Sequence, residues 1–162
     1  MIVVSDTSPI TNLAAVGLLE LLHALYDRVI IPQAVYDEMA SLGYQVPGTV
    51  EVQTFGWIES RAVSDRQRVE ELQVDLDLGE AEAIILALEL DAGLLLLDER
   101  RGRRVASDMG VRKISGLLAV LQEAKRKGLI SAIKPILDRL IVENNFRISD
   151  RLYNTVLQFA GE

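Results

Sequence analysis

The chain has 162 residues, of which 49% are hydrophobic and 25% are charged, a composition typical of one water-soluble domain. It has no cysteine and a single histidine, which excludes disulfides, thiolate metal sites, a cysteine nucleophile and a histidine-rich metal site. Its formal charge of −7 is opposite to that of a general nucleic-acid binder, so any polyanion has to be held by a local patch.

Short apolar runs alternate with helical patterns along the chain. The pattern predicts buried strands at residues 2–4, 28–31 and 94–97 and further short strands at residues 57–63 and 111–114. Apolar side chains at helical spacing predict helices at residues 7–26 (one long or two short), 33–41, 64–74, 79–90, 100–109, 116–127, 130–143 and 149–159. Residues 43–56 include Pro47 and Gly48 and are expected to form a loop with at most extended structure.

This alternation predicts an α/β fold. We expect three layers, α/β/α, with a central parallel sheet of four to five strands and right-handed crossovers. Residues 1–162 are expected to form a single domain, with a C-terminal helical segment from about residue 116. No apolar run reaches the roughly 20 residues of a membrane-spanning helix, and the first residues show no signal-peptide pattern. We therefore expect a cytoplasmic protein that does not associate with membranes.

Carboxylates follow two of the predicted strands. Asp6 comes after the first strand, and Asp98 follows the leucine strand with Glu99 beside it. Ligands of open α/β sheets gather at the carboxyl ends of the strands, where Glu38 and Glu80 on nearby helices could join these acids. Such a cluster raises carboxylate pKa values unless a cation compensates, and an all-oxygen site favours Mg²⁺ or Mn²⁺. The bound ion would polarise a phosphate and lower the pKa of its water.

Each acid also has a structural interpretation. Asp6 could cap the helix that follows it, and Asp98 could cap the helix that begins near residue 100. Glu38 could be a solvated side chain, and Glu80 could stabilise the first turn of its helix through the helix dipole. Glu82, two residues further on, faces elsewhere and is a second-rank candidate.

Four sequence blocks resemble the PIN-domain family of metal-dependent ribonucleases, in particular its VapC-like branch. The blocks are residues 3–8, the helix with Pro32, Val35 and Glu38, residues 79–84 and residues 96–103, and the C-terminal residues 146–149 also look like that branch. The resemblance implies a PIN-like fold and a metal site formed by Asp6, Glu38, Glu80 and Asp98. It also implies that Thr7 or Ser8 supports the site through a hydroxyl group. It leaves open the choices between Glu80 and Glu82 and between Asp98 and Glu99.

Four arginines follow the predicted metal ligand Asp98, where an RNA backbone would have to be held in an acidic protein. They are Arg100, Arg101, Arg103 and Arg104. We therefore expect them to bind RNA, although they could equally pair with acids on a solvated helix face.

The leading hypothesis is a Mg²⁺- or Mn²⁺-dependent endoribonuclease, similar to the toxin of a toxin–antitoxin pair. The resemblance further implies a homodimer and inhibition by a small antitoxin protein. One alternative is a non-catalytic module with a PIN fold that binds nucleic acid or protein. Another is a metal-site phosphotransfer domain, which Ser8 disfavours because a phosphatase would place an acid there, and which Asp98 and Lys113 match only loosely.

Overall fold

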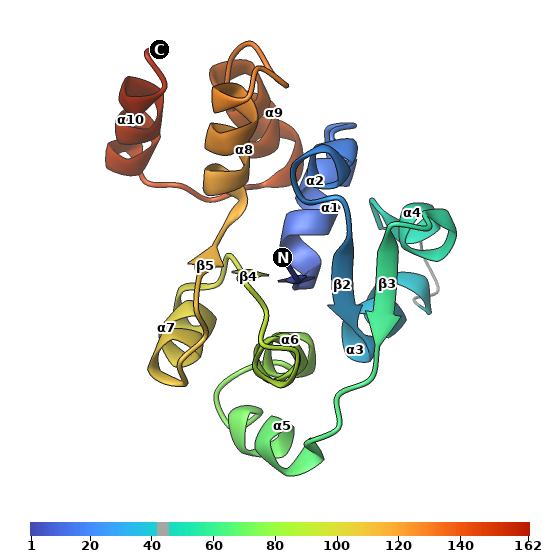
Figure 1. Ribbon diagram of the computed structural model, residues 1–162. Helices are drawn as coiled ribbons and strands as arrows, with labels where there is room; N and C mark the ends of the chain where they lie inside the picture. The colour runs from blue at the N-terminus through green and yellow to red at the C-terminus, as the bar shows by residue number, and fades with distance from the viewer. Residues whose placement is uncertain (42–45) are drawn as a thin grey trace.

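The structure, a computed structural model, describes residues 1–41 and 46–162 (Figure 1). Its strands form one sheet in the order β3-β2-β1-β4-β5, and every neighbouring pair is parallel. The strands are β1 (Val3–Ser5), β2 (Val29–Pro32), β3 (Ile58–Arg61), β4 (Leu94–Leu96) and β5 (Ile114–Ser115). The predicted parallel α/β sheet is confirmed, and all five predicted strands belong to it.

Helices connect the strands and follow the last one. They are α1 (Thr7–Ala15), α2 (Glu20–Tyr26), α3 (Gln33–Ala40), α4 (Thr49–Thr54), α5 (Arg66–Leu72), α6 (Leu78–Glu89), α7 (Arg100–Asp108), α8 (Leu117–Arg126), α9 (Lys134–Asn144) and α10 (Asp150–Phe159). The segment 7–26 forms two helices, because Gly17 adopts a positive φ of 72° that ends the first one.

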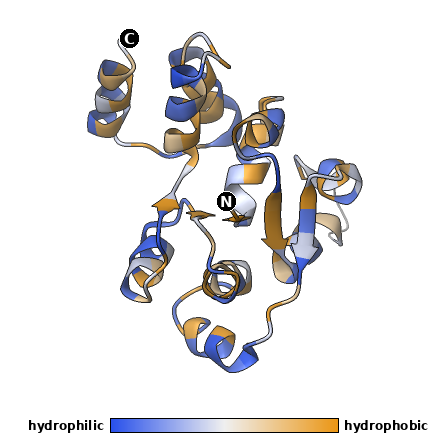
Figure 2. Cartoon of the chain, viewed as in Figure 1, coloured by the Kyte–Doolittle hydropathy of each residue, from blue (hydrophilic) through white to orange (hydrophobic). Residues whose placement is uncertain are grey.

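The sheet separates two hydrophobic cores, because successive side chains of a strand point to opposite faces. Val3 and Leu96 pack on one face with side chains of α1, α2, α8 and α9. Val4 and Leu95 pack on the other face with side chains of α5, α6 and α7. Figure 2 shows β2 as hydrophobic along most of its length, as expected for a strand buried on both faces. The three-layer prediction is therefore confirmed.

Three predicted segments differ clearly from the structure. Residues 49–54 form α4 instead of a loop: Gly48, at φ 95°, starts this short helix, which buries Val52. The remaining part of that predicted loop includes residues 43–45, which lie outside the described residues. The predicted strand 111–114 pairs only from Ile114 onward. The helix predicted from residue 130 begins at Lys134, where the Glu162 carboxylate accepts hydrogen bonds from the first backbone N–H groups.

The parallel arrangement decides where functional side chains can meet. Val4 pairs with Leu95 and Ser5 with Leu96, so β1 and β4 are direct neighbours and end at the same edge. Asp6 and Asp98 follow these two ends. Within the described part of the chain, no helix has the length and apolar character needed to cross a bilayer.

Candidate functional site

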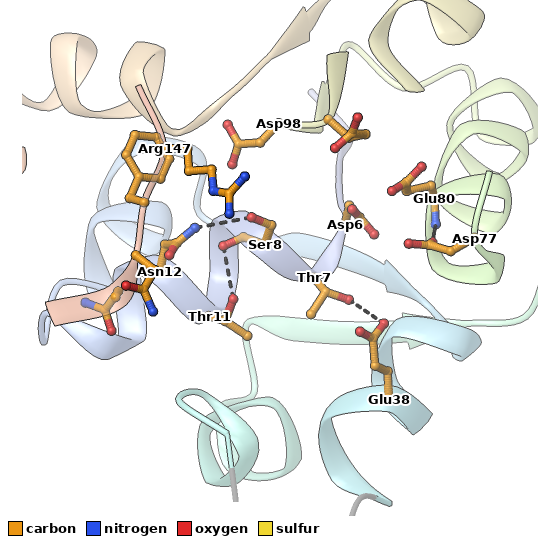
Figure 3. A pocket seen from close by; sticks show the side chains of 14 residues that line it. Asp6, Thr7, Ser8, Thr11, Asn12, Glu38, Asp77, Glu80, Asp98 and Arg147 are labelled. Carbon is orange, nitrogen blue, oxygen red and sulfur yellow. Dashed lines mark hydrogen bonds between the residues drawn. The ribbon is translucent and has the colours of Figure 1, made fainter. Parts of the chain in front are cut away.

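The carboxyl ends of β1 and β4 border a cavity of about 500 Å³ (Figure 3). One part of its lining consists of carboxylates: Asp6, Glu38, Asp77, Glu80, Asp98 and Glu99. The other part consists of neutral side chains and one arginine: Thr7, Ser8, Thr11, Asn12, Asn144, Asn145, Phe146 and Arg147. The structure thus brings the four predicted acids to one cavity, together with both predicted hydroxyl residues and Glu99.

Asp6 is a buried carboxyl at the N-terminal end of α1. It occupies the N-cap position, but its side chain makes no capping hydrogen bond, so the alternative interpretation as a helix cap is wrong. Its residue is 8% exposed. The pKa of Asp6 is raised to about 7, mainly by burial and in addition by the carboxylates of Asp77, Glu38 and Asp98, while the Thr7 N–H opposes the rise. The protein therefore compensates the charge of an ionised Asp6 only in part.

Asp98 is held by the beginning of α8. Its Oδ1 accepts a hydrogen bond of 2.8 Å from the Leu117 N–H, so it does not cap the helix that begins at Arg100. Gly116 makes this contact possible, because a Cβ at that position would lie 2.3 Å from Oδ1. Burial raises the pKa of Asp98, while the Leu117 N–H and Arg103 lower it. The other oxygen, Oδ2, is buried and has no hydrogen-bond partner among the described residues.

Glu38 reaches the cavity from α3 and is fixed by Thr7. The Thr7 hydroxyl donates a hydrogen bond of 2.9 Å to Glu38 Oε2 (Figure 3). Gly79 lies beside both acids: a Cβ there would be 3.4 Å from Asp6 Oδ1 and 3.4 Å from Glu38 Oε2. The glycine at the start of α6 therefore lets two carboxylates from different elements approach one helix end.

Glu80 and Asp77 add two carboxylates from the beginning of α6. Asp77 caps this helix, because its Oδ1 accepts a hydrogen bond of 2.8 Å from the Glu80 N–H. Burial raises the pKa of Glu80 to about 8, with further contributions from Asp77, Asp6 and Glu99. The sequence analysis missed Asp77, although an aspartate three residues before a glutamate is a recognisable helix-start pattern.

Glu82 lies outside the cavity. It is 3% exposed, accepts a hydrogen bond of 3.0 Å from the Ala34 N–H and pairs with Arg66 at 2.8 Å. Residues two apart on a helix point in different directions, which explains why Glu80 lines the cavity and Glu82 does not. The second-rank candidate therefore has a structural contact that joins α6 to α3 and α5.

The four predicted RNA-binding arginines lie outside the acidic cavity. Arg101 contacts the Asp75 carbonyl at 3.5 Å, and Arg103 lines a separate groove beside Asp98. Arg100 and Arg104 are exposed residues of α7. Among the described residues that line the cavity, Arg147 is the one cation, and the sequence analysis did not select it.

A family model described as a PIN domain matches residues 2–162. The chain belongs to the PIN-domain family. No curated protein and no solved structure matches it. PIN domains are usually nucleases that use divalent metal ions.

The side chains that line the cavity are of the chemical type that binds a divalent ion. The acidic donors are all carboxylate oxygens, which hard cations prefer, and the buried Oδ2 of Asp98 has a free coordination position. No three histidine, cysteine or acidic side chains within residues 1–41 and 46–162 are close enough to hold one ion as they stand. Without a cation, the carboxylates repel one another and stay apart, whereas a bound cation would reduce this repulsion and let them approach.

Proposed function

We propose that this PIN domain is a Mg²⁺- or Mn²⁺-dependent endoribonuclease that hydrolyses phosphodiester bonds in RNA. The observation that carries the proposal is the convergence of Asp6, Glu38, Glu80 and Asp98 on one cavity beside the ends of β1 and β4. The resemblance to the VapC-like branch supports a role as the toxin of a toxin–antitoxin pair. The proposal accordingly includes one domain over residues 1–162, a homodimer, a small antitoxin partner and a cytoplasmic location.

Asp6 and Asp98 are the principal residues that would hold the ion, with Glu38 and Glu80 beside them. When bound, the ion would supply a Lewis acid for the phosphate and a lower pKa for a water molecule. The Leu117 N–H holds one oxygen of Asp98 and leaves the other available. The Thr7 hydroxyl fixes Glu38. The carboxylates of Asp98 and Glu38 are therefore already ordered before RNA enters.

The decisive test removes one charge at Asp6. Asp6→Asn should lower Mn²⁺-dependent cleavage of a single-stranded RNA by at least about 100-fold, because a catalytic metal contributes several kcal/mol of transition-state stabilisation. Asp37→Asn is the matched control, since Asp37 accepts a hydrogen bond from Gln33 on the exposed side of α3 and does not line the cavity. Circular dichroism checks that both variants fold. An Asp6→Asn protein that cuts RNA as fast as the parent would refute the proposal.

A second function, a non-catalytic PIN module, is favoured by two observations. The described acids do not stand in a ready three-ligand arrangement, and the whole chain is acidic. Calorimetric titration with Mn²⁺ separates the two functions. A nuclease should bind Mn²⁺ in a manner that Asp6→Asn weakens, whereas a non-catalytic module should show no binding that depends on this residue.

A further inference from the structure

The connection between α9 and α10 brings Arg147 to the acidic cavity from the far end of the sequence. Asn145, in the left-handed region at φ 54°, ends α9, and the Phe146 N–H donates a hydrogen bond of 3.0 Å to the Leu140 carbonyl. The Phe146 side chain packs against the hydrophobic core. These two contacts fix the chain immediately before Arg147 and direct the arginine to the cavity.

No carboxylate of the described residues forms an ion pair with Arg147. The guanidinium points into the cavity towards Ser8 and Asp98 (Figure 3), yet it forms no ion pair or hydrogen bond with any residue in the described ranges. The arginine is exposed. A cation that lines the same cavity as six carboxylates without pairing with any of them is available to an anionic ligand that enters the cavity.

Other hydrogen-bond donors line the same cavity as Arg147. Asn12 comes from α1, where its amide donates to Ser8 Oγ at 3.2 Å. Asn144 comes from the end of α9, and its Nδ2 is buried without a hydrogen-bond partner among the described residues. The cavity therefore combines carboxylates, which suit a cation, with hydrogen-bond donors, which suit an anion.

We propose that Arg147 binds a phosphate of the RNA backbone. This inference rests on the proposed nuclease function and adds Arg147 to the predicted RNA-binding residues, of which Arg103 lines the adjacent groove. A guanidinium presents paired N–H groups that match two phosphate oxygens. Asp98, Phe146 and Arg147 line both the acidic cavity and the groove bordered by α8 and α10. Arg147 thus holds the strand where it passes from the cavity into this groove.

The test measures RNA binding and cleavage separately. Fluorescence anisotropy gives the affinity for a labelled single-stranded oligoribonucleotide in Ca²⁺, which takes the same oxygen ligands as Mn²⁺ and Mg²⁺, at several KCl concentrations. We expect Arg147→Gln to weaken binding about 10- to 100-fold and to reduce the salt dependence by about one phosphate contact, a slope change of about 0.7. Arg147→Lys should keep the salt dependence but recover only part of the affinity, because lysine lacks the paired donors.

Arg151→Gln is the matched control, because Arg151 is an exposed arginine in the first turn of α10 and lines neither cavity. It should bind RNA like the parent. Titration with Mn²⁺ alone should be unchanged in Arg147→Gln, which separates a phosphate contact from damage to the carboxylates.

The possible outcomes decide the two proposals separately. If Arg147→Gln binds RNA with the affinity and salt dependence of the parent, the inference is overturned even when the parent cuts RNA. If the variant binds weakly but the parent does not cut RNA in Mn²⁺, the phosphate contact stands and the nuclease function fails. If the parent does not bind the oligonucleotide at all, both are overturned.

Discussion

Replacing Asp6 by asparagine should stabilise the metal-free protein near pH 8, although most substitutions of buried residues destabilise. Asp6 is buried beside other carboxylates, and its pKa is raised from the ordinary 3.8 to about 7. The folded protein therefore binds a proton at this site more tightly than the unfolded chain does. The contribution of Asp6 to the free energy of unfolding is therefore fully present below about pH 4 and is lost as the pH rises through about 7.

The magnitude follows from the same values. A pKa difference of one unit corresponds to about 1.36 kcal/mol, so ionised Asp6 costs the folded, metal-free protein about 4 kcal/mol near pH 8. Asparagine has nearly the same shape and no charge. The variant should recover a large part of this free energy near pH 8 and little of it near pH 4, where Asp6 is protonated in the folded state.

Urea denaturation in EDTA, followed by circular dichroism, measures the free energy of unfolding at the two pH values. Added Mn²⁺ should raise the stability of the parent near pH 8 and change that of Asp6→Asn much less, because ligand binding stabilises only the protein that has the site. Asp37→Asn should follow the parent throughout. A variant less stable than the parent near pH 8 in EDTA would refute the electrostatic reasoning.

Three further predictions concern residues around the site, each measured by urea denaturation and Mn²⁺ titration. Gly116→Ala should destabilise the protein by about 1–3 kcal/mol and weaken Mn²⁺ binding, since the new Cβ would lie 2.3 Å from Asp98 Oδ1. The control Gly56→Ala, whose new Cβ would have nothing within 4 Å, should change neither quantity. If Gly116→Ala has no effect on either, Asp98 is placed differently. Glu82→Gln should destabilise by about 1–3 kcal/mol and leave Mn²⁺ binding unchanged, and weakened Mn²⁺ binding would assign Glu82 to the metal site. Glu162→Gln should destabilise by about 1–3 kcal/mol near pH 7, because two backbone N–H groups and Lys125 lower the pKa of this partly buried carboxyl to about 2. That contribution should disappear as the pH falls from about 4.5 through 2, and equal stability of variant and parent at pH 7 would contradict it.

The strands and most helices could be predicted because their side-chain patterns are local. A run such as Leu94–Leu97 is too short for a helix and too apolar for a surface strand, so the pattern alone indicates a buried parallel strand. The helix α4 could not be predicted in this way, because it is six residues long and follows Pro47 and Gly48, which are typical of a turn.

Carboxylates of the cavity could be anticipated from strand ends, whereas Arg147 could not. Asp6 and Asp98 come directly after strands that pair, so the position in the chain already indicates the edge at which they meet. Arg147 follows α9, and its approach to the cavity depends on how the C-terminal helices pack against α1. Nothing in the residues around it shows that packing, and the arginine cluster after Asp98 was the more obvious candidate.

Anomalous diffraction from a crystal soaked in Mn²⁺ tests the central claim most directly, because it locates the ion without reference to activity. We expect a manganese peak in the acidic cavity within bonding distance of Asp6 and Asp98, and no such peak in Asp6→Asn crystals. A soaked parent crystal with manganese bound elsewhere, or with an empty acidic cavity, would contradict the claim that these carboxylates form a metal site.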